Sequence, residues 1–254
     1  MTCIRHYRPN CHGSDKPRND RKAAFTLAEV LITLTILGVV AAVSIPSIIN
    51  HYEQRVTVTK VKKMYSTLTT AYDQYLVENN WVKPTYAGTT AGAQKMYEDL
   101  VKPYFQISYN AGTDTTKKRT IMAKGQYKWL NGHELGDYSA GDTYYAVQLK
   151  DSSVLWFRGK STGGVNLPTF RYDVNGKKAP NTLGRDIFIF SITDKGIIPG
   201  KSNTYQTPQT LAANCRIVNN SNNNVDNEDE ESNSVSGSAC AAYIILHGNM
   251  NYLK

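Results

Sequence analysis

Residues 25–50 read FTLAEVLITLTILGVVAAVSIPSIIN, and this stretch decides how the rest of the chain is organised. From Phe25 to Ile45 it contains one charged side chain, Glu29. In an α-helix this length extends about 31 Å, which matches the hydrocarbon thickness of one bilayer. The stretch therefore predicts a single membrane-spanning helix.

The composition of the whole chain describes one anchored, folded protein. A mean hydropathy of -0.44 excludes a polytopic membrane protein, and 17 Tyr, 6 Phe and 3 Trp exclude a disordered one. Of the net charge of +8, half lies in residues 1–24, which hold six basic and two acidic side chains. Because the rest of the chain is only mildly basic, its charge does not favour nucleic-acid binding.

Basic residues are more frequent just before the apolar stretch than just after it. Four basic side chains lie between positions 16 and 22, whereas the first two after the stretch are Arg55 and Lys60. This asymmetry predicts a cytoplasmic amino terminus and an exported body. A secretory signal cleaved near Ala42–Ser44 is the alternative. Glu29 argues against that alternative, because a carboxylate in hydrocarbon is costly and is by default functional.

The residues around position 24 resemble the processing site of type IV prepilins and type II secretion pseudopilins. Lys22-Ala23-Ala24 is followed by Phe25-Thr26-Leu27-Ala28-Glu29, and the resemblance extends from residue 21 to about residue 50. It implies that a prepilin peptidase cuts between Ala24 and Phe25 and methylates the new amino group. Ala24 departs from the family, which usually has Gly before the cut.

The same resemblance implies roles for three residues of the apolar stretch. Glu29 is the acidic residue at the fifth mature position, and its expected partner is the α-amino group of Phe25. In the family this pair is drawn between neighbouring subunits and sets the register of the filament. The sequence leaves open whether the pair forms within or between subunits. Gly38 and Pro46 lie where the family commonly has helix-loosening residues, so a kink is expected near them.

Beyond Pro46, apolar residues recur at helical spacing as far as Leu76. The predicted organisation is a removed leader at 1–24, a long kinked helix at 25–80 with its membrane part at 25–45, a head at 81–214 and a carboxy-terminal region at 215–254. The fold class is α+β, pilin-like, with the helix packed on an antiparallel sheet. A short helix is predicted at 93–101. Strands are predicted at 119–123, 126–130, 143–149, 153–158, 167–173 and 186–193.

Three short polar segments predict turns or loops. Asp151-Ser152 and Asp194-Lys195-Gly196 predict hairpin turns between apolar runs. Lys117-Lys118-Arg119 predicts a solvated loop rather than a nucleic-acid patch.

The segment from Asp173 to Asp186 is rich in turn-forming residues. Asp173, Asn175 and Asp186 supply oxygen atoms of the kind that Ca²⁺ binds, and Gly176 permits a sharp turn. The pattern departs from an EF-hand, since Gly stands at the fourth position and no Glu ends the loop. A structural turn held by Asx side chains is the favoured interpretation. Calcium is the alternative, since some pseudopilins bind it in the sheet region, and no other cofactor is expected.

The four cysteines divide into two pairs. Cys3 and Cys11 lie in the leader, whereas Cys215 and Cys240 lie in the exported body. Two cysteines in an oxidising compartment are expected to pair, and many pilins close a carboxy-terminal loop in this way. The closed loop is worth about 3 kcal/mol in the loop-entropy model. Its segment NNSNNNVDNEDEESNSVSGS is polar and acidic and is expected to be mobile.

No residue pattern in the chain predicts catalysis. The resemblance implies a structural subunit that polymerises into a type II secretion pseudopilus or a type IV pilus. Its partners would be prepilin peptidase, related pilin subunits, an inner-membrane assembly machinery and, before assembly, inner-membrane lipid. The head would face the periplasm or the exterior. Two alternatives remain: an anchored or secreted binding head that never polymerises, and a minor pilin that captures DNA.

The first testable prediction concerns processing. We expect a mature chain that lacks residues 1–24 and begins with N-methyl-Phe25. Mass spectrometry of the amino-terminal peptide from native membranes measures this directly. An amino terminus that maps after Ser44, or an intact leader in cells with active prepilin peptidase, would contradict it.

Overall fold

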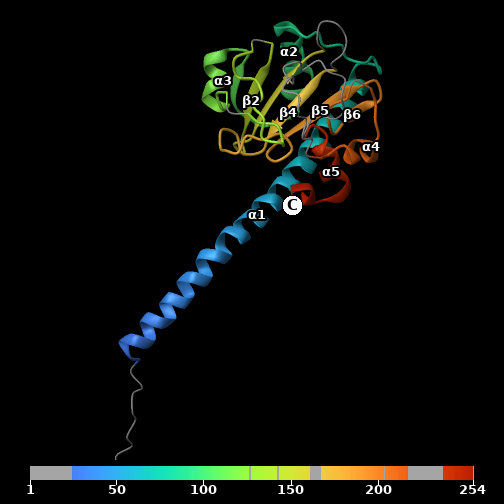
Figure 1. The fold of residues 1–254 in the computed structure, drawn as a ribbon. Helices are drawn as coiled ribbons and strands as arrows, with labels where there is room; N and C mark the ends of the chain where they lie inside the picture. Colours follow the sequence, from blue (N-terminus) through green and yellow to red (C-terminus); the bar gives the residue numbers. More distant parts are fainter. Residues whose placement is uncertain are drawn as a thin grey trace, which may run out of the picture. The chain divides into compact units, whose positions relative to one another are not determined.

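The computed structural model describes residues 25–125, 127–141, 143–160, 167–202, 204–216 and 237–253. The leader with Ala24, and residues 219–236 of the acidic stretch predicted to be mobile, lie outside the described residues. The chain divides into two units, of which the first ends at Ile48 and the second begins at Ile49. Helix α1, Leu27–Glu78, has residues in both units (Figure 1).

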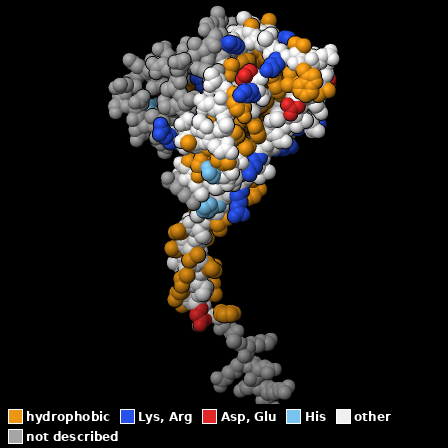
Figure 2. All heavy atoms as spheres, turned by 90° about the vertical axis from the view of Figure 1, so that its right-hand side faces the viewer, with side chains coloured by type: hydrophobic (Ala, Val, Ile, Leu, Met, Phe, Trp, Pro, Cys, Tyr) orange, Lys and Arg blue, Asp and Glu red, His pale blue; other side chains and the backbone are white. Residues whose placement is uncertain are grey.

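In the first unit, α1 exposes apolar side chains along its length (Figure 2), and its hydroxyl groups bond back to its own backbone. Thr33 Oγ1 donates to the Val30 carbonyl at 3.0 Å, and Ser44 Oγ donates to the Val40 carbonyl at 2.8 Å. These bonds lower the cost of placing hydroxyls in hydrocarbon. By length and composition α1 can cross a membrane.

In the second unit, α1 is amphipathic and packs on the sheet. Its buried side chains recur every three or four residues and are Val61, Met64, Leu68, Ala71, Tyr72 and Leu76. Most of them join one hydrophobic cluster with Phe157, Phe170, Phe188 and Phe190 of the strands. The helix ends where Asn80 and Trp81 adopt left-handed backbone angles.

The sheet has six strands in the order β1-β2-β3-β4-β5-β6, and every neighbouring pair is antiparallel. The strands are β1 (Ile107–Gly112), β2 (Tyr145–Leu149), β3 (Val154–Arg158), β4 (Thr169–Asp173), β5 (Ile187–Thr193) and β6 (Gly196–Ile198). The α+β, pilin-like fold class is therefore confirmed.

Both predicted hairpin turns are present. Between β2 and β3, Ser152 has a φ of 66°, and Asp151 Oδ1 accepts a bond from the Ser153 amide at 3.2 Å. Between β5 and β6, Gly196 has a φ of 122°, which a residue with a side chain rarely adopts.

Both faces of the sheet are buried, which explains why its central strands are apolar at successive positions. Leu155 and Phe157 of β3 belong to the cluster on the α1 face. Val154 and Trp156 belong to a second cluster on the opposite face, with Tyr127 and other aromatic residues. Because side chains alternate along a strand, two buried faces require apolar residues on both.

Two of the predicted strands are wrong. Residues 119–123 lie largely on helix α3 (Thr115–Ile121), because Asp114 caps it by accepting from the Lys117 amide at 2.9 Å. In 126–130, Lys128 makes only isolated bridges.

Two strands of the sheet were not predicted, and both lie at its edges. Strand β1 escaped prediction because it is mostly exposed, with irregular register and little apolar alternation. Strand β6 has three residues, which is too few to show the alternation of apolar and polar residues that predicts a strand.

The predicted solvated loop at 117–119 is also wrong. Lys118 lies on α3 and is fully buried. Its ammonium donates to the carbonyl of Gly141 and, at 3.3 Å, to that of Tyr144. These carbonyls belong to a segment distant in the sequence, so no local pattern could indicate them. Burial of Lys118 is a consequence of tertiary packing.

The predicted helix at 93–101 is present as two short elements. Helix α2 (Thr90–Met96) starts at Thr89, whose side chain accepts from the Gly92 amide at 3.2 Å. It continues directly into a π-helical turn, η1 (Tyr97–Val101). Its expected apolar face is confirmed, since Met96, Tyr97, Leu100 and Val101 are buried.

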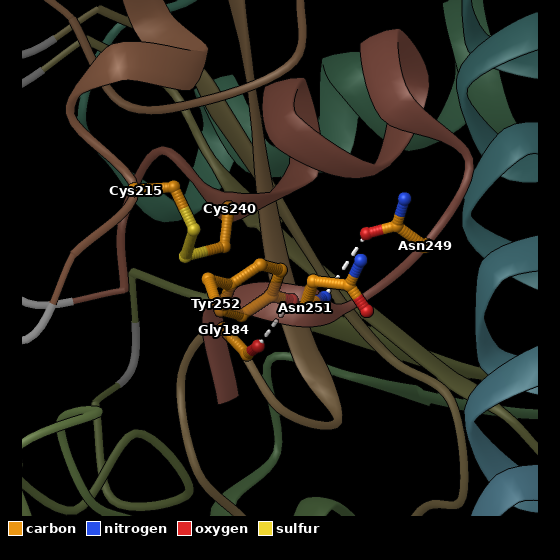
Figure 3. Close-up of a disulfide and its surroundings, with 6 residues drawn as sticks. All are labelled: Gly184, Cys215, Cys240, Asn249, Asn251 and Tyr252. Atoms are coloured by element: carbon orange, nitrogen blue, oxygen red, sulfur yellow. Dashed lines mark hydrogen bonds between the residues drawn. A yellow bond between two sulfur atoms is a disulfide. The ribbon is translucent and has the colours of Figure 1, made fainter. Parts of the chain in front are cut away.

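The carboxy-terminal region is joined to the head by a disulfide. Cys215 follows helix α4 (Pro208–Ala213), and Cys240 begins helix α5 (Cys240–His247). The disulfide is present, with the two Cα atoms 4.6 Å apart. After a short 3₁₀ turn, η2 (Asn251–Leu253), Tyr252 donates its hydroxyl to the Gly184 carbonyl at 2.6 Å (Figure 3).

Two glycines allow two chain segments beside the disulfide to approach each other closely. Gly184 has a φ of 82° and Gly237 a φ of 92°. A Cβ atom on Gly237 would lie 2.3 Å from the Leu183 carbonyl oxygen, and one on Gly184 would lie 2.9 Å from the Gly237 Cα. Side chains at either position would therefore separate the carboxy-terminal region from the turn after β4.

The second testable prediction concerns this disulfide. In the mature chain, replacing Cys215 and Cys240 together by Ser should lower the free energy of unfolding by about 3 kcal/mol. The rate of backbone hydrogen exchange should increase more in α5 than in the second half of α1. Free thiols at Cys215 and Cys240 in natively exported protein would contradict the prediction.

Candidate functional site

The amino terminus of α1 is closed by a reciprocal capping arrangement. Thr26 donates its backbone amide and its hydroxyl to Glu29 Oε2, each at 2.8 Å. In return, the Glu29 amide donates to Thr26 Oγ1 at 3.2 Å. This is a capping box, which satisfies backbone donors that a helix start leaves without partners.

Glu29 therefore has a local structural role that the sequence-based prediction missed. The signal was present, because Thr26-Leu27-Ala28-Glu29 has the T-x-x-E spacing that precedes an apolar helix. The hydrogen bonds from Thr26 all reach Oε2. Oε1 accepts no hydrogen bond from the described residues, so half of the carboxylate stays available to a second donor.

The residues around Glu29 provide an apolar setting for this carboxylate. Phe25 is 86% exposed and Leu27 is 79% exposed. Large exposed hydrophobic side chains continue along α1 as far as Ile49 (Figure 2). Such a continuous apolar surface requires a partner other than water, either lipid or other helices.

Gly38 and Pro46 both lie inside α1, which continues through them. A Cβ atom on Gly38 would have no neighbour within 4 Å, so close packing in the described chain does not require Gly there. Pro46 has no N–H to donate to the carbonyl one turn earlier. The expected kink at these residues stays a prediction.

A family model supports this interpretation of the amino terminus. The model of the prokaryotic N-terminal methylation motif matches residues 19–45. The chain carries a prepilin-type cleavage and methylation motif. This motif is found in type IV pilins and pseudopilins. Comparisons with curated proteins and with solved structures gave no significant match.

The prepilin motif supports some of the sequence-based predictions and leaves others untested. It confirms the resemblance found at residues 21 to about 50, and it marks a structural, pilin-type precursor. It implies processing by a prepilin peptidase and assembly with other pilins. With the apolar helix, it fits a single-pass, membrane-anchored pilin. The cleavage point at Ala24 and Phe25 and the role of Glu29 in assembly stay predictions.

The second candidate site is the turn between β4 and β5. Asp173 Oδ1 accepts from the amides of Asn175 at 3.1 Å and Gly176 at 2.8 Å. Asp186 accepts from the amides of Asn181 at 2.8 Å and Thr182 at 2.6 Å. The two carboxylates thus organise one turn from its two ends, as the structural interpretation expects.

Burial gives these two carboxyl groups unusual acid–base properties. Burial, together with the nearby charge of Asp186, raises the pKa of Asp173 well above its usual range. Burial also raises the pKa of Asp186 to about 6, although the amides of Thr182 and Asn181 oppose the change. Asp173 Oδ2 is buried and has no hydrogen-bond partner. We therefore assign to the Asp173 carboxyl group a higher proton affinity in the folded chain than in the unfolded chain.

The geometry fits calcium poorly. Ca²⁺ takes six to eight oxygen ligands, whereas three of the four carboxylate oxygens here already accept backbone amides. In this turn, the buried side-chain oxygens without a hydrogen-bond partner are Asp173 Oδ2 and Asn175 Oδ1. No group of three or more His, Cys, Asp or Glu residues in the described parts of the chain could hold a metal. Calcium at Asp173, Asn175 and Asp186 stays a prediction.

The third testable prediction concerns the Asp173–Asp186 pair. Because their folded-state pKa values are raised, the folded chain holds protons that the unfolded chain has already released. Their contribution to stability should therefore be present near pH 4 and should fall as the pH rises, for Asp186 through about 6.

Asp173→Asn keeps an oxygen for both backbone amides and is neutral at every pH. The wild-type unfolding free energy should decline relative to this variant by about 1–3 kcal/mol between pH 4 and pH 7. Urea unfolding of the mature chain in detergent measures the difference. Asp194→Asn, at an exposed carboxylate, is the control. Parallel curves for wild type and Asp173→Asn would contradict the assignment.

Proposed function

We propose that the chain is a structural subunit that polymerises through α1 into a type II secretion pseudopilus or a type IV pilus after cleavage before Phe25. The observation that carries the proposal is the prepilin motif at residues 19–45, which includes the apolar first part of α1. The function is assembly rather than chemistry. The head would lie on the exported side of the membrane, as the distribution of basic residues predicts.

The apolar half of α1 suits both stages of such a cycle. Before assembly its exposed side chains would be covered by lipid, and in a filament by the same helices of other subunits. Lipid tails and apolar side chains are similar surroundings for the helix. Exchanging one for the other therefore gives little preference for one register between neighbouring helices. A directional interaction is needed to set the register, and Glu29 is the charged residue in the apolar run.

Cleavage would supply the partner of Glu29. The new α-amino group of Phe25 has an ordinary pKa of about 8 and is mostly charged at neutral pH. It would lie about one helical turn from Glu29 of the same chain. Glu29 Oε1 accepts no hydrogen bond within the described structure, so it can accept one from this group of the same subunit or of a neighbour. The capping box uses Oε2 and survives either arrangement.

The fourth testable prediction separates the charge of Glu29 from its capping role. Glu29→Gln keeps an acceptor for the capping box but removes the charge, whereas Thr26→Ala removes the cap but keeps the charge. With the assembly machinery co-expressed, Glu29→Gln should reduce the yield of sheared or crosslinked multimers by roughly tenfold or more, because the Phe25 ammonium enters an apolar core unpaired. Thr26→Ala should reduce it much less.

Membrane insertion is the control readout for this experiment. Glu29→Gln removes a charge and Thr26→Ala removes a hydroxyl group, so each makes the span more apolar, and both variants should reach the membrane in normal amounts. If Glu29→Gln assembles as wild type does, the charge does not set the register. If the wild-type protein is found only as a membrane monomer beside active machinery, the proposed polymer is wrong and a membrane-anchored head is favoured.

A further inference from the structure

A cavity of about 290 Å³ lies within the second unit, beside the first turns of α1 after the apolar run. Its walls come from three parts of the chain. One wall is α1 from Asn50 to Lys60, the second is the turn between Val174 and Asp186, and the third is the carboxy-terminal pair Met250 and Leu253. The disulfide and the Tyr252 hydrogen bond to Gly184 hold the third wall in place.

The cavity begins at the level where the apolar run ends. The predicted span ends at Ile45, the apolar residues Ile48 and Ile49 follow it, and the lining of the cavity starts at the next residue, Asn50. The α1 wall extends for about 15 Å of helix, and the polar layer of a bilayer adds roughly 5–7 Å beyond the hydrocarbon on each side. Tyr52, also in the wall, is 68% exposed. Tyrosine is enriched at this level of membrane proteins.

The lining of the cavity combines cations that make no ion pair in the described residues with apolar side chains. Lys178 and Arg185 line it and make no ion pair within the described parts of the chain. Lys60 is already engaged, donating to the Val174 carbonyl at 2.9 Å and pairing with Asp151 at 3.3 Å. The apolar residues of the lining are Val56, Val174, Ala179, Pro180, Met250 and Leu253.

Two carboxylates also line the cavity. Asp186 is turned to the backbone amides of Asn181 and Thr182. Glu53 is exposed and faces the same space. Glu53 would repel an ion with two negative charges more strongly than a phosphodiester, which carries one. Two free cations, one exposed carboxylate and an apolar lining thus suit a singly charged phosphodiester attached to an apolar group.

We propose that this cavity binds the phosphodiester headgroup of an anionic membrane phospholipid, with the phosphate between Lys178 and Arg185. The inference rests on the membrane-anchored stage of the proposed function, and it adds a specific lipid contact of the head to that stage. Bound lipid holds the turn between β4 and β5 at the membrane surface. Because a filament contains no bilayer at this level, assembly has to break the contact.

The fifth testable prediction is measured on the full mature chain in detergent by native mass spectrometry. Phosphatidylglycerol adducts should survive on the wild type at least about fivefold more than on the double variant Lys178→Gln, Arg185→Gln, since the variant loses both charge-assisted hydrogen bonds to the phosphate. The double variant Lys83→Gln, Lys124→Gln, at exposed lysines outside the cavity, is the matched control and should bind as wild type does.

Two comparisons identify the source of the phosphate. Phosphatidylcholine should be retained less than phosphatidylglycerol, and inorganic phosphate at equal concentration should not displace phosphatidylglycerol. Equal retention of both lipids by wild type and cavity variant, or displacement by inorganic phosphate, would overturn the proposal. Because the assay needs no assembly machinery, a negative result here leaves the polymerisation experiment unaffected, and a negative result there leaves this one unaffected.

Discussion

One constraint governs this protein: a single helix of 52 residues, α1, has to be stable in two different surroundings. Its first half exposes apolar side chains that water does not solvate well. Its second half buries a stripe of side chains against a sheet and turns polar groups outward. The change occurs within about two turns after Pro46, where Asn50, His51 and Glu53 replace the apolar run. The position of this change separates the part of α1 that needs an apolar partner from the part that packs on the sheet.

In the second unit, the sheet buries the apolar stripe of α1. It offers one face to α1 and covers the other with the aromatic cluster around Tyr127 and Trp156, whose ring centroids are 5.6 Å apart. Both faces are therefore dry, and the head is stabilised by packing that does not involve the first half of α1. Such a head can stay folded while, in the proposed cycle, the apolar helix exchanges lipid for protein.

The polar features near the end of the apolar run are held by long-range contacts. The turn between β4 and β5 is organised by two buried carboxylates, and the carboxy-terminal residues reach it through the disulfide and Tyr252. Together with the first polar turns of α1 they enclose the cavity that faces the polar layer of the membrane in our proposal. The conformation of the carboxy terminus thus contributes to a site at the other end of the sequence.

Local patterns in the sequence determined the motif, the span and much of the sheet. Phe25 to Glu29 was identifiable because a charge in an apolar run is costly at any position and is visible without a fold. Strands β2 to β5 were identifiable because buried strands are rich in apolar and aromatic residues over several positions. The capping signal Thr26-x-x-Glu29 is equally local, because the start of a helix depends on neighbouring residues alone.

Only the tertiary structure decided what local patterns leave ambiguous. Lys118 is charged, yet it is buried because carbonyls of Gly141 and Tyr144 satisfy it from a distant segment. Asp173 ends β4 and Asp186 directly precedes β5, and pairing of these strands brings the two together, so burial and mutual charge raise their pKa values. The sequence determined where this chain meets the membrane, because hydropathy is a local sum over neighbouring residues. The fold decided which polar groups lose their water, because burial depends on contacts between residues far apart in the chain.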